Sequence, residues 1–137
     1  MTGWRWTLAA GAIAAHIAAL ALGAVWWLTS REDISRQVVV PELSAEALAG
    51  KADFDREWAR CHGENARGSE KGPPLVHRTY HPALHADVAF ELAVQRGVRA
   101  HHWRFGDMPP QPTLPPAEIT RITTYIRELQ KANGIYR

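Results

Sequence analysis

The chain has 137 residues, enough for one ordinary domain and a further segment but too few for two full domains. A hydrophobic share of 46% and a charged share of 22% are typical of a folded protein and argue against a disordered one. The net charge of +2 gives no reason to expect nucleic acid as a partner.

The first predicted element is an apolar segment, residues 6–28, which contains no formally charged residue. As a helix it would be about 35 Å long, enough to cross a hydrocarbon core of about 30 Å. We therefore expect residues 1–29 to form a transmembrane anchor that lies in the lipid bilayer. Tryptophans flank the segment at both ends, as at the two interfaces of a membrane: Trp4, Trp6, Trp26 and Trp27.

A cleaved signal peptide and a buried soluble helix are the alternatives to an anchor. Residues 21–24 offer small side chains to a peptidase, but the apolar core of a signal peptide usually has about 7–15 residues, and this one is longer. Arg5 before the span gives a weak bias toward a cytoplasmic N-terminus. This predicts a single-pass protein of the cell inner membrane with a periplasmic domain. We interpret His16, within the span, as neutral and facing another helix rather than as a ligand.

A linker and one domain are expected to follow the anchor. Residues 30–43 are the predicted linker, in which Pro41 biases the preceding Val40 toward an extended backbone. Residues 44–137 are the predicted domain, and no segment of it shows the alternation of a strand. The sequence therefore predicts an all-α domain of three to five helices with long loops.

Three helices of this domain can be placed by their caps and apolar spacing. Ser44 can cap a helix that begins near Ala45, and a second helix is predicted over residues 86–95. The last runs over residues 116–133, where isoleucines and Leu129 recur every three or four residues. Between the second and the last helix lies a loop rich in proline, which excludes regular helix: Pro109, Pro110, Pro112, Pro115 and Pro116.

The single cysteine suggests a cofactor. Cys61 cannot form an intramolecular disulfide, so it is free, paired between chains or attached to a cofactor. It precedes His62, and a thiol can form a thioether with a haem vinyl group while the adjacent imidazole binds the iron. Met108 is the one methionine besides the initiator, so it is the candidate for a second axial ligand, stiffened by the two prolines that follow it.

From residue 54 to residue 135 the sequence resembles a class I c-type cytochrome, closest to membrane-anchored bacterial members with one haem. In that family a helix ends in C-x-x-C-H, a Gly-Pro-x-Leu loop follows, a methionine ligand lies on a proline-containing loop, and a C-terminal helix closes the fold. The corresponding residues are Cys61-His62-Gly63, Gly72-Pro73-Pro74-Leu75, Phe105-Gly106-Asp107-Met108-Pro109-Pro110 and Tyr125 of the last helix.

The resemblance implies a role for several residues. His62 and Met108 would be the axial ligands of a haem c iron, and the Pro73 carbonyl would accept a hydrogen bond from the axial imidazole. Leu75 would pack against the ring. The propionates would contact Tyr80 and Trp103, for which a place in the aromatic core is the alternative, and Phe54 and Tyr125 would meet where the terminal helices cross.

One position departs from the family pattern. The first cysteine of the motif would fall at position 58, where this chain has Trp58, so a single thioether through Cys61 is predicted. Natural single attachment, a substitution by design or sequence error, and a domain that no longer takes haem are the three explanations. Because both iron-ligand positions are present, we expect haem to bind.

The remaining histidines and a group of arginines are ambiguous. Copper or zinc binding is one interpretation of the histidines, and surface or hydrogen-bonded histidine is the one we prefer. Arg96, Arg99 and Arg104 form either a solvated basic face or a docking rim for an acidic redox partner. The histidines concerned are His77, His81, His85, His101 and His102.

The function expected from these features is electron transfer without substrate chemistry, so the protein is not expected to be an enzyme. Its partners would be membrane redox complexes, respiratory or photosynthetic, that act as electron donor and acceptor. A non-catalytic structural subunit with absent or idle haem is the alternative. A haem-based sensor or ligand binder is a third possibility, favoured if Met108 does not bind the iron.

Overall fold

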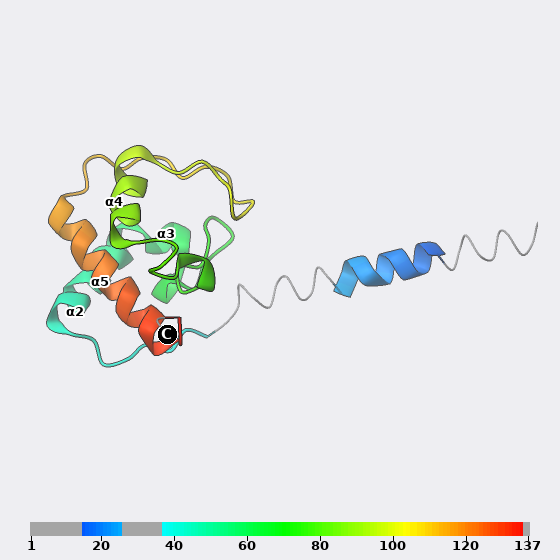
Figure 1. Cartoon of the computed structure of the whole chain (residues 1–137), viewed down its shortest axis with the longest axis horizontal. Helices are drawn as coiled ribbons and strands as arrows, with labels where there is room; N and C mark the ends of the chain where they lie inside the picture. Colours follow the sequence, from blue (N-terminus) through cyan, green and yellow to red (C-terminus); the bar gives the residue numbers. More distant parts are fainter. Residues whose placement is uncertain (1–14, 26–36, 136–137) are drawn as a thin grey trace, which may run out of the picture. The chain divides into compact units, whose positions relative to one another are not determined.

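A computed structural model describes residues 15–25 and 37–135 of the chain (Figure 1). The chain divides into two units, Met1–Ser35 and Arg36–Arg137. In the first, residues 15–25 form a helix. No helix among the described residues is both long enough and apolar enough to cross a membrane. The rest of the predicted span, residues 6–14 and 26–28, lies outside the described residues, so the anchor stays a prediction.

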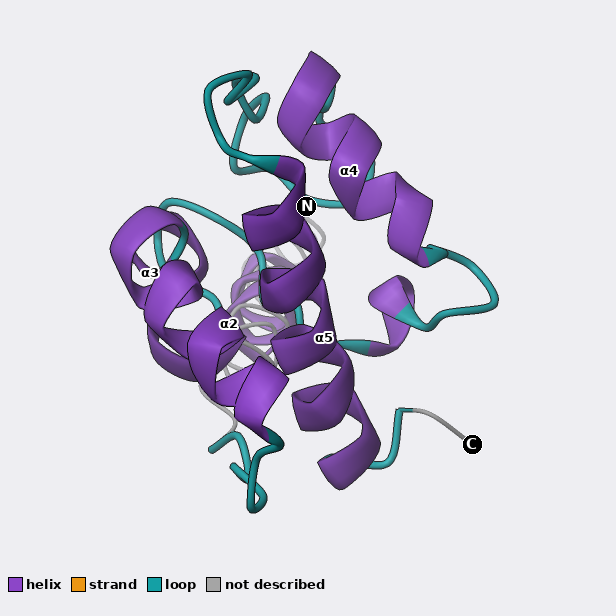
Figure 2. Ribbon diagram, turned by 90° about the vertical axis from the view of Figure 1, so that its left-hand side faces the viewer, coloured by secondary structure: helices purple, strands orange, loops and turns teal. Residues whose placement is uncertain are grey.

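The second unit is built of helices and loops (Figure 2). Its described part has no strand, and its β-type pairing is an isolated bridge between Val98 and Met108. The expected all-α domain is therefore confirmed, and the second predicted helix differs from the observed one by a single residue at each end. The helices are α2 (Ala45–Glu57), α3 (Ala59–His62), α4 (Asp87–Arg96) and α5 (Pro116–Ala132), with 3-10 turns at Glu64–Ala66 and Arg78–Tyr80.

The crossing of α2 and α5 forms the centre of the unit. Gly50 lies so close to the carbonyl of Arg121 that a β-carbon at position 50 would collide with it, which means that the two helices can approach this closely only at a glycine. Beside this contact the Phe54 and Tyr125 rings meet edge to face, with centroids 5.5 Å apart. The expected meeting of these two aromatic residues is confirmed.

Polar contacts fix the ends of the same helices. The Ser44 hydroxyl accepts a hydrogen bond from the Ala47 amide at 3.2 Å, which is the expected N-cap of α2. The same hydroxyl donates to Glu128 of α5. Val39 exchanges two hydrogen bonds with the side chain of Asn133, at 3.0 and 2.8 Å. Residues 38–43 of the predicted linker are therefore packed against the domain rather than free of it.

Buried polar groups on α5 hold the loop between the Glu64–Ala66 turn and α4. The Arg127 side chain is 8% exposed and donates to Asp87 and to the carbonyls of Tyr80 and His85. Gln130, which is fully buried, donates to the carbonyl of Leu75 at 2.9 Å. Since a buried polar group without a partner costs about 1–3 kcal/mol, these bonds fix the loop firmly. They place Leu75, Tyr80 and His85 beside one cavity.

Candidate functional site

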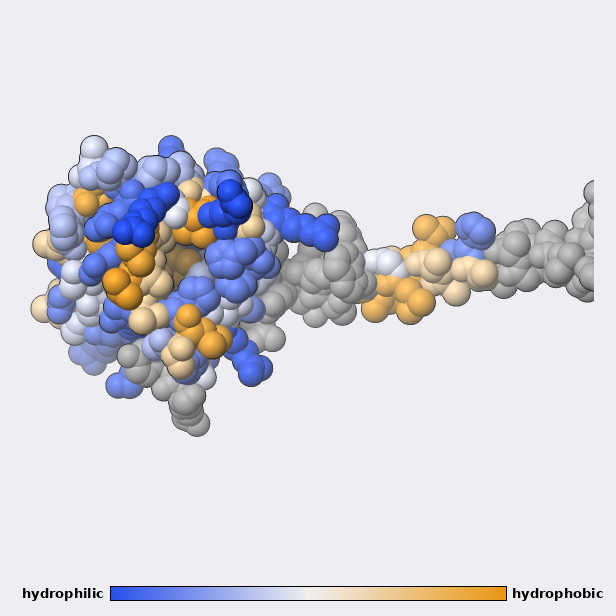
Figure 3. Space-filling model, turned by 45° about the horizontal axis from the view of Figure 1, so that its top comes forward, coloured by the Kyte–Doolittle hydropathy of each residue, from blue (hydrophilic) through white to orange (hydrophobic). Residues whose placement is uncertain are grey.

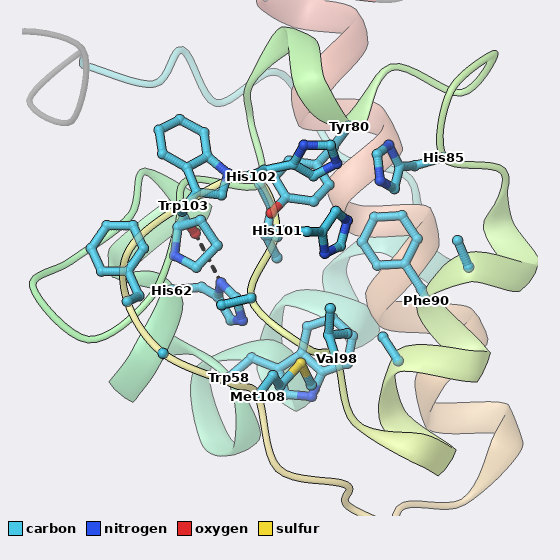
Figure 4. A pocket seen from close by; sticks show the side chains of 17 residues that line it. Trp58, His62, Tyr80, His85, Phe90, Val98, His101, His102, Trp103 and Met108 are labelled. Carbon is cyan, nitrogen blue, oxygen red and sulfur yellow. Dashed lines mark hydrogen bonds between the residues drawn. The ribbon is translucent and has the colours of Figure 1, made fainter. Parts of the chain in front are cut away.

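An apolar pocket lies between α3, α4, the loop that α5 holds and the loop over residues 98–108 (Figure 4). Its empty space is about 820 Å³ when the part open to solvent is included. On the face shown in Figure 3, hydrophobic residues (orange) border a hollow in the surface of the domain. The pocket brings together residues from segments more than forty positions apart in the chain.

His62 reaches the pocket from the end of α3. It is 9% exposed, and its Nδ1 lies 2.9 Å from the carbonyl oxygen of Pro73. A carbonyl can only accept, so Nδ1 carries the proton and donates, and Nε2 keeps a free lone pair. Burial lowers the pKa of His62, and the hydrogen bond to Pro73 partly opposes that shift. The result is a neutral, oriented imidazole of the kind that binds metals.

The backbone beyond His62 can turn only because of a glycine. Gly63 has φ +73°, and a β-carbon there would collide with the carbonyl of Gly68. The Gly68 amide in turn donates to the His62 carbonyl at 2.7 Å. This tight loop returns the chain toward Pro73, so the proline carbonyl faces the imidazole. The sequence Cys61-His62-Gly63 therefore encodes both the candidate ligand and the turn that orients it.

Met108 reaches the pocket from the loop that follows α4. Its amide and carbonyl form two 2.9 Å hydrogen bonds with Val98, and the Ala100 amide donates to Asp107 at 2.8 Å. Gly97, at φ +73°, allows this approach, because a β-carbon there would lie 2.5 Å from the Met108 carbonyl oxygen. The base of the loop is thereby tied to the end of α4. His62 and Met108, the two predicted iron ligands, line the same pocket.

The other residues named by the resemblance also line this pocket. Pro73 and Leu75 do so, and Leu75 is 5% exposed. Burial raises the pKa of the Tyr80 hydroxyl, which keeps it protonated, and the indole of Trp103 partly opposes the shift. The buried Trp103 N–H has no hydrogen-bond partner among the described residues. The Tyr80 hydroxyl and the Trp103 N–H are therefore two donors that can form hydrogen bonds with an anionic group in the pocket.

Trp58 forms part of the pocket wall. It is 3% exposed, and its ring lies nearly parallel to that of Phe90, with centroids 6.5 Å apart and 10° between the planes. It also contacts Phe54 edge to face and lies 6.2 Å from the His62 ring centroid. The indole thus occupies core volume where the family pattern has a small cysteine. The replacement of the family's first cysteine by Trp58 stays a prediction, and the structure shows that the indole is a packed part of the wall.

Cys61 is the predicted site residue that does not reach the pocket. Its thiol is free and half-buried, and it is absent from the pocket lining. Successive residues on a helix point about 100° apart, so the Cys61 side chain leaves α3 in a different direction from that of His62. Its backbone carbonyl accepts a hydrogen bond from the Ser69 hydroxyl at 2.5 Å. The structure therefore brings the two axial candidates together and leaves the attachment residue beside them.

Three histidines also line the pocket, a grouping that sequence reasoning missed. His101 and His102 are exposed, as the preferred surface interpretation expects, whereas His85 is half-buried. One ring nitrogen from each of the three lies within 4.8 Å of the others. Desolvation lowers the pKa of His102, and the neighbouring His101 and His85 lower it further. Only the adjacency of His101 and His102 near the methionine loop was visible in the sequence. His77 and His81 are not part of this group.

The sequence of the domain matches a known protein family. The family model described as Cytochrome c matches residues 47–130. The chain belongs to the cytochrome c family. No curated protein and no solved structure matches it. Members of the cytochrome c family are electron-transfer proteins, generally without enzymatic activity, that carry covalently bound haem c.

The residues of the pocket fit such a group in all but one respect. An apolar lining suits the haem face, the buried His62 imidazole has a free lone pair, and a methionine thioether lies in the same cavity. The buried Trp103 N–H provides a donor that lacks a hydrogen-bond partner among the described residues. The exception is attachment, because Cys61 is the single cysteine and does not line the pocket.

Proposed function

We propose that this cytochrome c carries single electrons on the periplasmic side of a membrane by means of one haem c held in the pocket. The observation that carries the proposal is the convergence of His62, oriented by Pro73, and Met108 on one apolar cavity. A haem bound there supplies the Fe(II)/Fe(III) couple. With His62 and Met108 both bound, the iron would have no open position, which would suit electron transfer and not substrate chemistry.

Each side chain then has a defined task. His62 would bind iron through Nε2, while the Pro73 carbonyl fixes its tautomer and makes the imidazole more basic. Met108 would provide the thioether sulfur, which favours Fe(II) and raises the potential. Leu75 and Phe90, both buried, contribute to the apolar wall of the cavity. Tyr80 and Trp103 would donate to the propionates.

The proposal includes a tether and redox partners. Support for the tether comes from the apolar segment 6–28 with tryptophans at both ends. Arg96, Arg99 and Arg104 are exposed close to the methionine loop, and such a basic rim suits an acidic surface on a membrane redox complex that donates or accepts electrons. Mass spectrometry of the membrane-extracted protein should give a mass that includes residues 6–28. A soluble form that begins near Val25 would show cleavage instead.

Attachment is proposed to be a single thioether through Cys61. With Trp58 at the other position, one vinyl group stays unsaturated. The pyridine haemochrome band of the purified protein should lie between those of b-type haem and doubly attached c-type haem, and acid-acetone should leave the haem on the chain. Complete extraction would exclude the thioether while leaving axial binding possible. Absence of haem from protein matured in a cell that makes c-type cytochromes would refute the proposal.

A second candidate function is a structural subunit whose haem is absent or idle. Two observations favour it, namely the Trp58 indole packed into the pocket wall and the position of Cys61 outside the lining. Under this alternative the chain would copurify with a membrane redox complex in stoichiometric amount but without haem of its own. Haem quantitation on the purified complex, compared with the complex that lacks this chain, separates the two functions.

A further inference from the structure

His85, His101 and His102 form a compact group at the pocket that electron transfer through a haem does not use. His85 lies just before α4, whereas His101 and His102 lie on the loop that leads to Met108. The ring centroids of His101 and His102 are 4.1 Å apart, and those of His85 and His102 are 5.3 Å apart (Figure 4). One nitrogen from each ring lies within 4.8 Å of the others.

Two local features indicate that His101 and His85 can bind a metal ion. The Nδ1 of His101 lies 2.7 Å from the carbonyl oxygen of Arg99, so this nitrogen donates and Nε2 keeps its lone pair. A backbone carbonyl that fixes the ring in this way is the usual support of a metal-binding histidine. The Nδ1 of His85 is buried and has no hydrogen-bond partner among the described residues. A buried polar atom without a partner calls for an explanation, and a bound ion provides one.

We propose that His85, His101 and His102 bind one divalent transition-metal ion, Zn²⁺ or Cu²⁺, through three imidazole nitrogens. Imidazole suits these ions, and no carboxylate belongs to the group, which argues against Ca²⁺ and Mg²⁺. Three histidines leave a fourth position for water, as in open tetrahedral zinc sites. At equal availability Cu²⁺ binds such ligands more tightly than Zn²⁺. The proposal does not depend on haem loading or on the proposed function.

Binding requires a small closure of the loop. Zinc–nitrogen bonds of about 2.0–2.1 Å in a tetrahedral site place the ligand nitrogens about 3.4 Å apart. In this structure the nitrogens of the three histidines are separated by up to 4.8 Å. His101 and His102 are exposed, so their side chains can move by the order of 1 Å, while the Val98–Met108 bridge holds the base of the loop. The ion would then fasten the methionine loop to the segment before α4. Metal binding would in this way restrain the loop that presents Met108.

The test is a calorimetric titration of the full chain in detergent, purified without a polyhistidine tag, with Zn²⁺. One equivalent should bind to the unaltered protein. His85→Ala and His102→Ala should each weaken binding by about tenfold or more. The matched control is His81→Asn, which removes an imidazole outside the group and keeps an acceptor for the Ala83 amide that His81 now binds. This control should bind Zn²⁺ as the unaltered protein does.

A spectroscopic measurement on the unaltered protein tests the site without relying on variants that could misfold. The electron paramagnetic resonance spectrum with one equivalent of Cu²⁺ should show hyperfine coupling to three nitrogen nuclei, with any haem quantified separately. Coupling to one nitrogen or none would overturn the proposal, as would Zn²⁺ affinity that is equal in His85→Ala, His102→Ala and the control. Because both readouts concern the added ion, they remain decisive whether or not the chain contains haem.

Discussion

The Nδ1 of His62 donates a hydrogen bond to the carbonyl oxygen of Pro73 over 2.9 Å, inside a pocket where the imidazole is 9% exposed. The bond fixes the neutral tautomer and directs Nε2 to any metal in the cavity. It connects two motifs eleven residues apart, one that supplies the proposed ligand and one that orients it. Substitutions at either end therefore test the proposed haem site.

The first prediction concerns His62. His62→Ala removes the proposed proximal ligand, so haem per chain, measured as pyridine haemochrome against protein, should fall about tenfold or more. His81→Asn serves as the control, because it also removes one histidine but lies outside the pocket lining. Its haem content should equal that of the unaltered protein. Equal haem in His62→Ala would exclude His62 as a required ligand.

The second prediction concerns Trp58. Trp58→Cys and Trp58→Ser leave the same cavity beside Phe90, and each should lower the free energy of unfolding by about 3–5 kcal/mol in haem-free protein. Only the cysteine variant can form a second thioether. Its haemochrome band should move toward that of doubly attached c-type haem, and its haem-loaded form should resist denaturant better than the serine variant, because a second covalent link constrains the unfolded chain.

The serine variant makes this comparison decisive, because it matches cysteine in size but has no thiol. If both variants give the same band position and the same denaturant midpoint, position 58 does not lie where a thioether can form. That result would count against the correspondence between Trp58 and the family's first cysteine. A shift confined to the cysteine variant would identify the position as an attachment site that the indole replaces.

The third prediction concerns acid stability. Asp53 is 6% exposed, and its two oxygens bind Arg56 at 2.9 Å and Arg121 at 2.8 Å, which links α2 to α5. Burial alone would raise the pKa of Asp53, but the two arginines outweigh it and hold the pKa below its usual value. The folded pKa is thus below the unfolded one, so the unfolded chain binds more protons. This stabilisation is present above about pH 4 and is lost as the pH falls through the folded pKa.

Chemical denaturation of the full chain in detergent at several pH values measures this effect. Asp53→Asn should lower the free energy of unfolding near neutral pH by about 1.5–3 kcal/mol and should show a weaker decline below about pH 4. The control, Asp55→Asn, breaks an exposed pair with Lys51 and should cost less than about 1 kcal/mol. An equally steep acid decline in Asp53→Asn would mean that other carboxylates govern it.

Much of the fold could be predicted because its signals are local. Ser44 caps α2 through its own side chain, and the isoleucines of α5 repeat at helical spacing until the helix ends two residues before Gly134. The 3-10 turns and the separate short α3 were not predicted, since they depend on how the chain packs. The packing of residues 38–43 was likewise not visible, because the partner of Val39 is Asn133, ninety-four positions away.

The candidate site likewise has features that the sequence predicts and features that depend on the folded chain. His62 and Met108 could be named because a ligand-bearing side chain and its flanking glycine or prolines lie together in the sequence. The position of Cys61 outside the pocket lining could not be predicted, since it depends on how α3 packs. The gathering of His85 with His101 and His102 depends on the return of the methionine loop, which the pairing of Val98 with Met108 sets. No local pattern encodes that distance.

The central claim is that the protein carries one electron on a haem held by His62 and Met108. A potentiometric titration followed by visible absorption tests it most directly, with Met108→Leu as the matched variant of similar size and no ligating sulfur. The unaltered protein should give one reversible one-electron transition, and the variant should lose the iron–sulfur charge-transfer band and titrate at a lower potential. Absence of any reversible transition in the unaltered protein, or an identical band and potential in Met108→Leu, would contradict the claim.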